Sequence, residues 1–156
     1  MKTLVAYYSR TGTTKKIAEI LAEKLGADVE EIRDTVNRQG IKGYLMSGRD
    51  AMKKNLTKLE ALKFNPKEYD LVIIGTPIWG WNMSVPIRTY LTENKDQFSK
   101  VAFFCTMGGS GDVKAFAEME QITGRKPLVT LSLKTVEVVK NNFSEKLEDF
   151  VAKLNA

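Results

Sequence analysis

The sequence predicts an α/β fold in which a parallel sheet lies between two layers of helices. Apolar runs suited to strands alternate with segments of helical apolar spacing along all 156 residues. The runs Leu71–Ile74 and Val101–Phe104 are continuously apolar, as expected of strands that are covered on both faces. Right-handed crossovers between successive strands would place helices on both sides of the sheet. No linker or repeat interrupts the pattern, so we expect a single domain over residues 1–156.

Local signals place each element in turn. Gly26 is suited to end the first helix, because glycine readily adopts the left-handed conformation there. Ser84 followed by Pro86 is typical of a helix start, with the serine as the capping residue. An apolar stripe marks the last helix: Phe143, Leu147, Phe150, Val151 and Leu154. We expect strands near residues 2–8, 28–33, 70–76, 100–106 and 127–133, and helices near 13–25, 43–55, 84–92, 112–122 and 143–154.

The turn between the first strand and the first helix predicts a phosphate site. It reads Ser9-Arg10-Thr11-Gly12-Thr13-Thr14, with four hydroxyl side chains around a helix N-terminus that offers free backbone N–H groups. It lacks the glycines and the lysine of the Walker loop and the three glycines of the dinucleotide-binding loop. The alternative is that the hydroxyls only cap the helix, but one cap needs one hydroxyl.

Two later loops, at residues 76–81 and 106–112, predict a site for a flat ring. The first carries two indoles on a turn, and we expect Trp79 to be exposed and to stack on a heteroaromatic ring. Trp81 has the alternative of being an ordinary core residue. The second loop has three glycines that let backbone N–H groups approach a ligand. Asp112 after it is expected to cap the next helix or to contact the ligand, and Cys105 before it is interpreted as a small core residue.

Composition limits the chemistry that side chains could perform. The chain has no histidine and one cysteine, which excludes Ser–His and Cys–His catalysis, a zinc cluster and an internal disulfide. We therefore expect no metal and no catalytic side chain, so any reaction would depend on a cofactor. No apolar run is long enough for a membrane span, and the single cysteine leads us to expect a cytoplasmic protein.

Charge is concentrated in one segment. Residues 33–68 hold nine Lys or Arg and four acidic residues, an excess equal to the net charge of +5 of the whole chain. The segment could dock an acidic protein partner or could be a solvated helix surface. Few aromatic residues accompany these charges, so nucleic-acid binding is not expected.

The three loops together resemble those of the flavodoxin family, in the same order along nearly the whole chain. The resemblance implies a doubly wound five-stranded sheet of order 2-1-3-4-5 in three α/β/α layers, with FMN at its edge. It also implies that a peptide around Gly80 turns over when the flavin is reduced. The implied cofactor-binding residues are Ser9, Arg10, Thr11, Gly12, Thr13, Thr14, Thr76, Pro77, Ile78, Trp79, Gly80, Trp81, Thr106, Met107, Gly108, Gly109, Gly111 and Asp112.

As a function, we expect a low-potential one-electron carrier between redox partner proteins. Two departures from the family pattern keep alternatives open. Residues 106–111 contain no aromatic side chain to cover the outer flavin face, although Met107 could partly cover it. The chain is also basic, whereas electron-carrier flavodoxins are usually acidic. The alternatives are an NAD(P)H-dependent FMN quinone or flavin reductase, and a non-redox binding module on the same fold.

Overall fold

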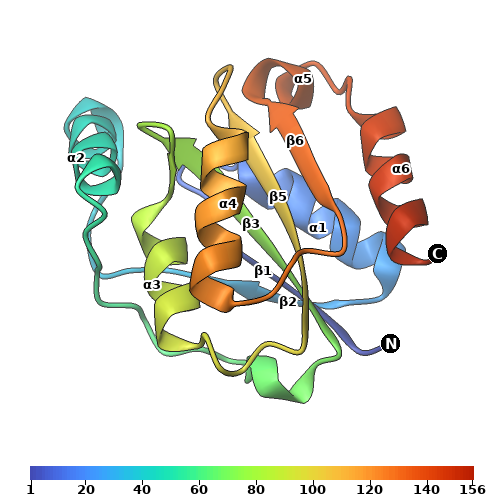
Figure 1. Ribbon diagram of the computed structural model, residues 1–156. Helices are drawn as coiled ribbons and strands as arrows, with labels where there is room; N and C mark the ends of the chain where they lie inside the picture. The colour runs from blue at the N-terminus through green and yellow to red at the C-terminus, as the bar shows by residue number, and fades with distance from the viewer.

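The computed structural model describes all 156 residues and contains a five-stranded parallel sheet of order β2-β1-β3-β5-β6 (Figure 1). The strands are β1 (Thr3–Tyr7), β2 (Asp28–Glu31), β3 (Leu71–Trp79), β5 (Lys100–Met107) and β6 (Thr130–Lys134). Counted as five parallel strands, this is the expected order 2-1-3-4-5. A two-residue strand that the sequence did not predict, β4 (Asn82–Met83), pairs antiparallel with the end of β3.

Helices lie on both faces of the sheet, as expected (Figure 1). Helices α1 (Thr13–Leu25) and α6 (Ser144–Leu154) pack on one face, and α3 (Val85–Glu93) and α4 (Asp112–Thr123) pack on the other. Gly26 ends α1 with φ 60°, which confirms its predicted role. Ser84 precedes α3, but its hydroxyl contacts the Thr76 hydroxyl at 3.1 Å and caps nothing, so that part of the prediction was wrong. The short α5 (Thr135–Val139) and the 3₁₀ turn at Pro66–Glu68 were not predicted.

The core consists of two clusters separated by the sheet. Successive residues of a strand point to opposite faces, so Leu4 and Ala6 join one cluster while Val5 and Tyr7 join the other. The predicted continuous run in β3, Leu71–Ile74, is at most 1% exposed. Each such aliphatic side chain stabilises the fold by about 1.5–3 kcal/mol. The sheet is therefore a rigid base whose carboxyl edge holds the loops of interest.

Helix α2 (Gly40–Met52) lies beside the carboxyl ends of the strands and begins three residues before the predicted start (Figure 1). One face, formed by Gly43, Ser47 and Ala51, is buried. Gly43 sits so close to the preceding chain that a Cβ there would lie 2.2 Å from the carbonyl carbon of Arg38. No helix of the structure is long and apolar enough to cross a membrane.

Arg38 fixes α2 in this place. Its guanidinium is paired with Asp34 at 2.9 Å, and both side chains are only 2% exposed. It also lies 3.5 Å from the Asp50 carboxylate and donates to the Ser47 hydroxyl at 3.2 Å, both on α2. The basic segment is therefore not simply a solvated surface, because one of its nine cations is an internal anchor.

Candidate functional site

The turn after β1 leaves hydrogen-bond donors free at the start of α1. Gly12 precedes the helix with φ 99°, a conformation that favours glycine, and donates its N–H to the Ser9 hydroxyl at 3.0 Å. The first helical bond runs from the Lys16 N–H to the Gly12 carbonyl at 3.0 Å. The N–H groups of the residues between them therefore point out of the helix end, where the macrodipole is positive. No side chain caps α1, so the alternative that Ser9, Thr11 and Thr13 only cap this helix is wrong.

Two threonines connect this turn to the end of β5. The hydroxyls of Thr14 and Thr106 lie 2.8 Å apart, and the residues are 2% and 3% exposed. Either hydroxyl can be the donor, so the pair can offer a proton or a lone pair to a third group. This contact joins the predicted phosphate turn to the predicted ring loop.

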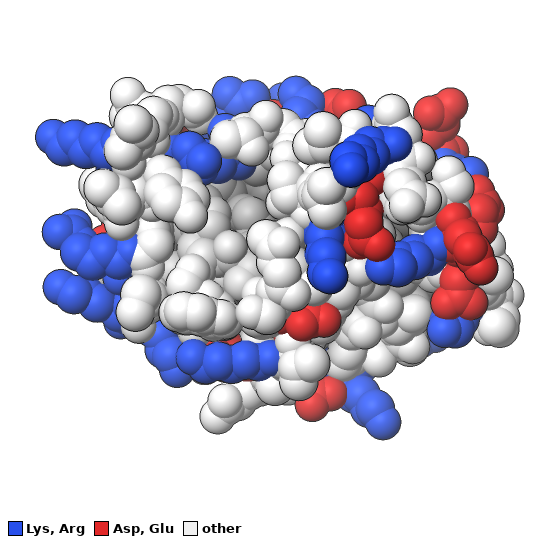
Figure 2. Space-filling model, turned by 90° about the horizontal axis from the view of Figure 1, so that it is seen from above, with Lys and Arg blue, Asp and Glu red and all other residues white.

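A cavity of about 280 Å³ extends from the turn across the carboxyl edge of the sheet. It brings together parts of all three loops that the sequence singled out, and Figure 2 shows a hollow of uncharged atoms when this edge is viewed from above. The lining consists of Ser9, Arg10, Thr11, Thr13, Thr14, Tyr44, Pro77, Ile78, Trp79, Thr106, Met107, Gly108 and Thr135. Hydroxyls gather at one end and apolar side chains form the other, which fits a phosphate joined to a flat ring.

Several predicted binding residues lie outside this cavity: Gly12, Thr76, Gly80, Trp81, Gly109, Gly111 and Asp112. The Thr76 side chain is buried and its hydroxyl donates to the Pro77 carbonyl at 2.8 Å. The Asp112 carboxylate accepts from the Ser132 hydroxyl at 2.7 Å, and Gly111 is the residue that precedes α4. The prediction that Asp112 caps α4 was therefore wrong, because its carboxylate is held by the neighbouring strand.

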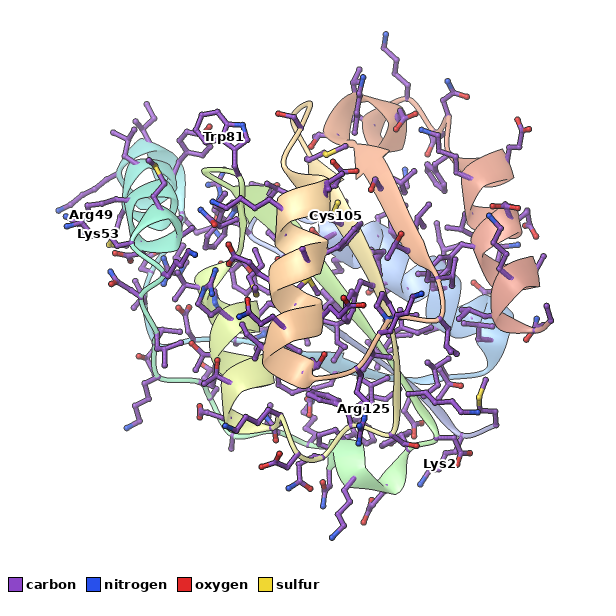
Figure 3. The ribbon with its side chains drawn as sticks, in the orientation of Figure 1. Lys2, Arg49, Lys53, Trp81, Cys105 and Arg125 are labelled. Atoms are coloured by element: carbon purple, nitrogen blue, oxygen red, sulfur yellow. The ribbon has the colours of Figure 1, made fainter.

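The two indoles have exchanged the roles that we expected. Trp79 is only 8% exposed, whereas Trp81 is 59% exposed at the tip of the β3–β4 hairpin (Figure 3). The Trp79 ring meets the Tyr8 ring edge-on at 5.3 Å and lies 5.4 Å below the Arg38 guanidinium. The prediction that Trp79 is the exposed indole was wrong, since both neighbours cover it. Part of its ring still lines the cavity.

The hairpin tip is tightly enclosed. Gly80 and Trp81 have φ 52° and 63°, so both central residues are left-handed, as in a type I′ turn. The Asn82 amide donates to the Gly80 carbonyl at 2.7 Å. A Cβ on Gly80 would lie 2.4 Å from the Met52 Cγ, and one on Gly111 would lie 3.0 Å from the Trp81 Cα. The tip is thus held between α2 and the glycine loop, and the expected peptide movement at Gly80 stays a prediction.

Sequence reasoning missed two residues of the cavity, Tyr44 and Thr135. Tyr44 projects from α2, is 61% exposed and has the Arg10 guanidinium 5.3 Å over its ring. Thr135 begins α5, and its hydroxyl donates to the Met107 carbonyl at 3.2 Å. The only signal for Tyr44 was an aromatic residue on the polar side of a predicted helix, and nothing local indicated that this helix borders the site.

The cavity contains no carboxylate, thiol or ammonium group, and Arg10 is its only charged residue. Cys105 lies just below it and is fully buried, and burial raises the pKa of its thiol to about 12. Its interpretation as a core residue is confirmed. Burial likewise raises the pKa of Tyr8 to about 12, so its phenol stays neutral at pH 7. The side chains can therefore bind and orient a ligand, and no acid or base poised near neutrality is present.

A second, polar cavity of about 420 Å³ lies on the other side of the turn and includes Gly12. Its walls carry charges of both signs, and the pair Arg33–Glu31 at 2.7 Å neutralises part of them. It lacks the loops after β3 and β5, so it is a poor candidate for the ring site.

A family model described as Flavodoxin matches residues 2–152. The chain belongs to the flavodoxin family. No curated protein matches it in sequence. Among solved structures, a flavoprotein from Lactobacillus acidophilus NCFM in complex with FMN is 25% identical with a TM-score of 0.73, over 89% of this chain and 97% of that one.

Two further structures are similar. A protein from Bacteroides uniformis ATCC 8492, named as a flavoprotein, is 25% identical with a TM-score of 0.75, over 93% of this chain and 97% of that one. A flavodoxin, WrbA-like protein from Agrobacterium tumefaciens is 14% identical with a TM-score of 0.58, over 97% and 98%, which shows the shared fold alone. The expected family and fold are thus confirmed, and the expected cofactor is the one named with the Lactobacillus structure.

Proposed function

We propose that this protein binds FMN at the carboxyl edge of its sheet and carries single electrons between protein partners. The observation that carries the proposal is the continuity of one cavity from a donor-rich helix N-terminus to an apolar wall. Ser9, Thr11, Thr13 and Thr14 with the adjoining N–H groups would hold the phosphate dianion. The ring would lie against Pro77–Trp79 and Thr106–Gly108, with Tyr44 at its margin.

The lining favours electron transfer over chemistry by side chains. Bound FMN would supply the redox reaction, and no residue of the cavity offers a general acid or base near pH 7. The task of the chain is then to bind the cofactor, to exclude water from its inner face and to set the polarity around it. The neutral hydroxyls, the single cation of Arg10 and the buried Met107 are the groups that would do so.

Features at the same edge support a protein partner of opposite charge. Trp81 is an exposed aromatic residue beside the cavity, a common feature of recognition surfaces. Lysine and arginine side chains gather on the side of α2, as Figure 2 shows at the left. An acidic partner with an apolar centre would complement this surface.

The first test is FMN binding itself. We expect the purified protein to take up one FMN in calorimetry, and Thr11→Ala with Thr14→Ala to raise the dissociation constant by about tenfold or more, since a charge-assisted hydrogen bond contributes roughly 1.5–3 kcal/mol. Thr130→Ala, on the exposed start of β6, is the matched control and should change nothing. Unchanged affinity in the double variant would place the phosphate elsewhere.

A second candidate, an NAD(P)H-dependent reductase, is favoured by the loop at residues 106–111, which carries no aromatic side chain over the outer face of the cavity. Two measurements on the FMN-loaded protein distinguish the carrier from the reductase: anaerobic titration with dithionite, and steady-state oxidation of NAD(P)H with a quinone. Two resolved one-electron steps support the carrier. Rapid steady-state oxidation of NAD(P)H with a quinone would support the reductase and contradict the carrier.

A further inference from the structure

A groove of about 630 Å³ separates α2 from the end of β3, next to the cavity described above. Such a volume falls within the roughly 300–1,000 Å³ that is usual for small-molecule sites. Most of the lining is apolar, and it consists of Tyr44, Leu45, Gly48, Arg49, Met52, Lys53, Ile78, Trp79 and Gly80.

Two of the apolar side chains of this groove remain largely exposed to solvent. Leu45 and Met52 on α2 are 65% and 60% exposed, although the opposite face of the same helix is buried. Large apolar side chains that stay in water lose the stabilisation that burial of their surface would give. A ligand that covers them would recover that stabilisation.

Two glycines shape the groove. A Cβ on Gly48 would have no atom within 4 Å, so the wall of α2 is empty at that point. On the facing side, a Cβ on Gly80 would lie 2.4 Å from the Met52 Cγ, so α2 approaches the hairpin closely there. The same position on Gly80 lies 3.3 Å from the Gly48 carbonyl oxygen, so the space between the hairpin and α2 is narrow and suits a flat molecule.

Positive charge borders the groove. The stems of Arg49 and Lys53 line it, while their charged ends extend outward from α2 into solvent (Figure 3). The nearby carboxylate of Asp50 is shared between Arg38 at 3.5 Å and Arg49 at 3.6 Å. Lys53 forms no ion pair, so an anionic group at the mouth of the groove would be favoured.

The groove is continuous with the cavity proposed for FMN. Tyr44, Ile78 and Trp79 line both spaces. A molecule in the groove would therefore lie beside the ring cavity and outside the phosphate turn, because no residue of that turn lines the groove.

We propose that this groove is a second ligand site, for a flat apolar small molecule that carries an anionic group. Its position beside the ring cavity rests on the proposed FMN binding, but its occupancy does not, because none of the phosphate-turn residues lines it. The apolar walls select the ring system of the ligand, and Arg49 with Lys53 select its charge.

The probes are naphthalene-2-carboxylate and its neutral amide, naphthalene-2-carboxamide, titrated calorimetrically into the protein with and without FMN. We expect one site in either form, with the carboxylate bound roughly fivefold more tightly than the amide, as two solvent-exposed cations would give. In Arg49→Gln with Lys53→Gln the two probes should bind equally. Lys126→Gln, an exposed cation at the opposite edge of the sheet, should keep the preference.

Gly48→Leu tests the location, because Gly48 lines the groove and a Cβ there would have no atom within 4 Å. We expect this variant to fold, to bind FMN as before and to lose at least about tenfold in affinity for both probes, since filling removes the apolar surface that the ring covers. Unchanged probe binding in Gly48→Leu, or equal binding of the two probes by the unaltered protein, would overturn the proposal.

Two further outcomes separate this inference from the proposed function. If Gly48→Leu lowers the affinity for FMN, the ring occupies the groove, and the second site is ruled out. If the unaltered protein binds naphthalene-2-carboxylate but takes up no FMN, the proposed function fails while this inference stands.

Discussion

At the scale of single residues, Arg38 links the fold to the site. Its guanidinium lies over Trp79, pairs with Asp34 and reaches Ser47 on α2. Asp34 in turn accepts from the Thr57 hydroxyl at 3.1 Å. One buried cation thus holds the indole that borders the ring cavity and the helix that borders the groove.

Arg38→Met should reduce the free energy of unfolding by about 3–5 kcal/mol, because the Asp34 carboxylate would stay buried without its partner. Urea denaturation followed by tryptophan fluorescence measures this directly. The double variant Asp34→Asn with Arg38→Met, which leaves no buried charge, should recover part of the loss. If Arg38→Met alone is as stable as the unaltered protein, the Arg38–Asp34 pair makes no net contribution to the free energy of unfolding.

Predictions for single residues agreed with the structure where neighbouring residues carried the signal. They failed where the length of a strand decides which way a side chain points. The hydroxyls of residues 9–14 were expected at the start of a helix, and α1 begins there at Thr13. The tryptophans were assigned the wrong way round because β3 was expected to end near residue 76, yet it runs to Trp79. Side chains alternate along a strand, so the longer strand turned Trp79 inward and left Trp81 at the hairpin tip.

At the scale of elements, α2 was predicted as a helix but could not be positioned. Its place depends on the buried guanidinium of Arg38 and on the close approach of the chain at Gly43, and the apolar pattern of the helix shows neither of these. The same applies to the two-residue β4 and to α5, which are too short to show periodicity. The other long strands and helices lie within three residues of their expected bounds.

Two glycines of α2 give a matched pair for testing this placement. Gly43→Ala should destabilise the protein by about 1–3 kcal/mol, because the new Cβ would overlap the Arg38 backbone. Gly48→Ala in the same helix meets no atom and should stabilise by about 0.5–1 kcal/mol through helix propensity. Thermal unfolding of both variants checks the signs. If the two substitutions change the thermal stability equally, the close contact between Gly43 and the Arg38 backbone does not position α2.

Glu118 on α4 pairs with one cation on α3 and one just after α2, and these pairs make stability depend on pH. Burial alone would raise its pKa, but hydrogen bonds from Arg88 on α3 and Lys54 after α2 outweigh burial and hold the pKa below its usual range. Because the pKa of Glu118 is lower in the folded state, its carboxylate contributes fully to the free energy of unfolding above the unfolded-state pKa of about 4.3. This contribution is lost as the pH falls through the pKa of the folded state.

Glu118→Gln should therefore lower the free energy of unfolding at pH 7 by about 1–3 kcal/mol. The difference from the unaltered protein should shrink as the pH falls below about 4, where the carboxylate itself becomes protonated. Denaturant titrations at pH 7 and pH 3 measure it. A difference that is the same at both values would contradict the charged interaction. Glu120→Gln, an exposed neighbour without an ion pair, is the control.

At the scale of the whole molecule, sheet order assembles the site. With β1, β3 and β5 adjacent, the loops that follow them meet at one edge although about a hundred residues separate the first from the last. The alternation of elements predicted the layers but not the order of strands, which came from the family resemblance. The charge is also uneven at this scale, with cations gathered on the α2 side of that edge (Figure 2).

This asymmetry predicts how the reduced, FMN-loaded protein reacts with small oxidants. Its oxidation by ferricyanide, an anion, should slow several-fold between about 10 mM and 500 mM salt, because screening weakens attraction to the basic side. Oxidation by hexaamminecobalt(III), a cation, should accelerate. Stopped-flow absorbance measures both rates. Arg49→Gln with Lys53→Gln should flatten both dependences, and Lys126→Gln should leave them unchanged. Identical salt dependence for the two oxidants would contradict electrostatic control.

The left-handed pair at the hairpin tip has an energetic consequence. Rotating the peptide plane between Gly80 and Trp81 by half a turn would carry Trp81 to negative φ, while Gly80 keeps a backbone state open only to glycine. That rotation would relieve about 1–2 kcal/mol of crowding at Trp81 and would break the bond from the Asn82 amide, a loss of about 0.5–1.5 kcal/mol. Two shapes of this loop are therefore nearly isoenergetic, and a change of one proton on a neighbouring ligand would be enough to choose between them.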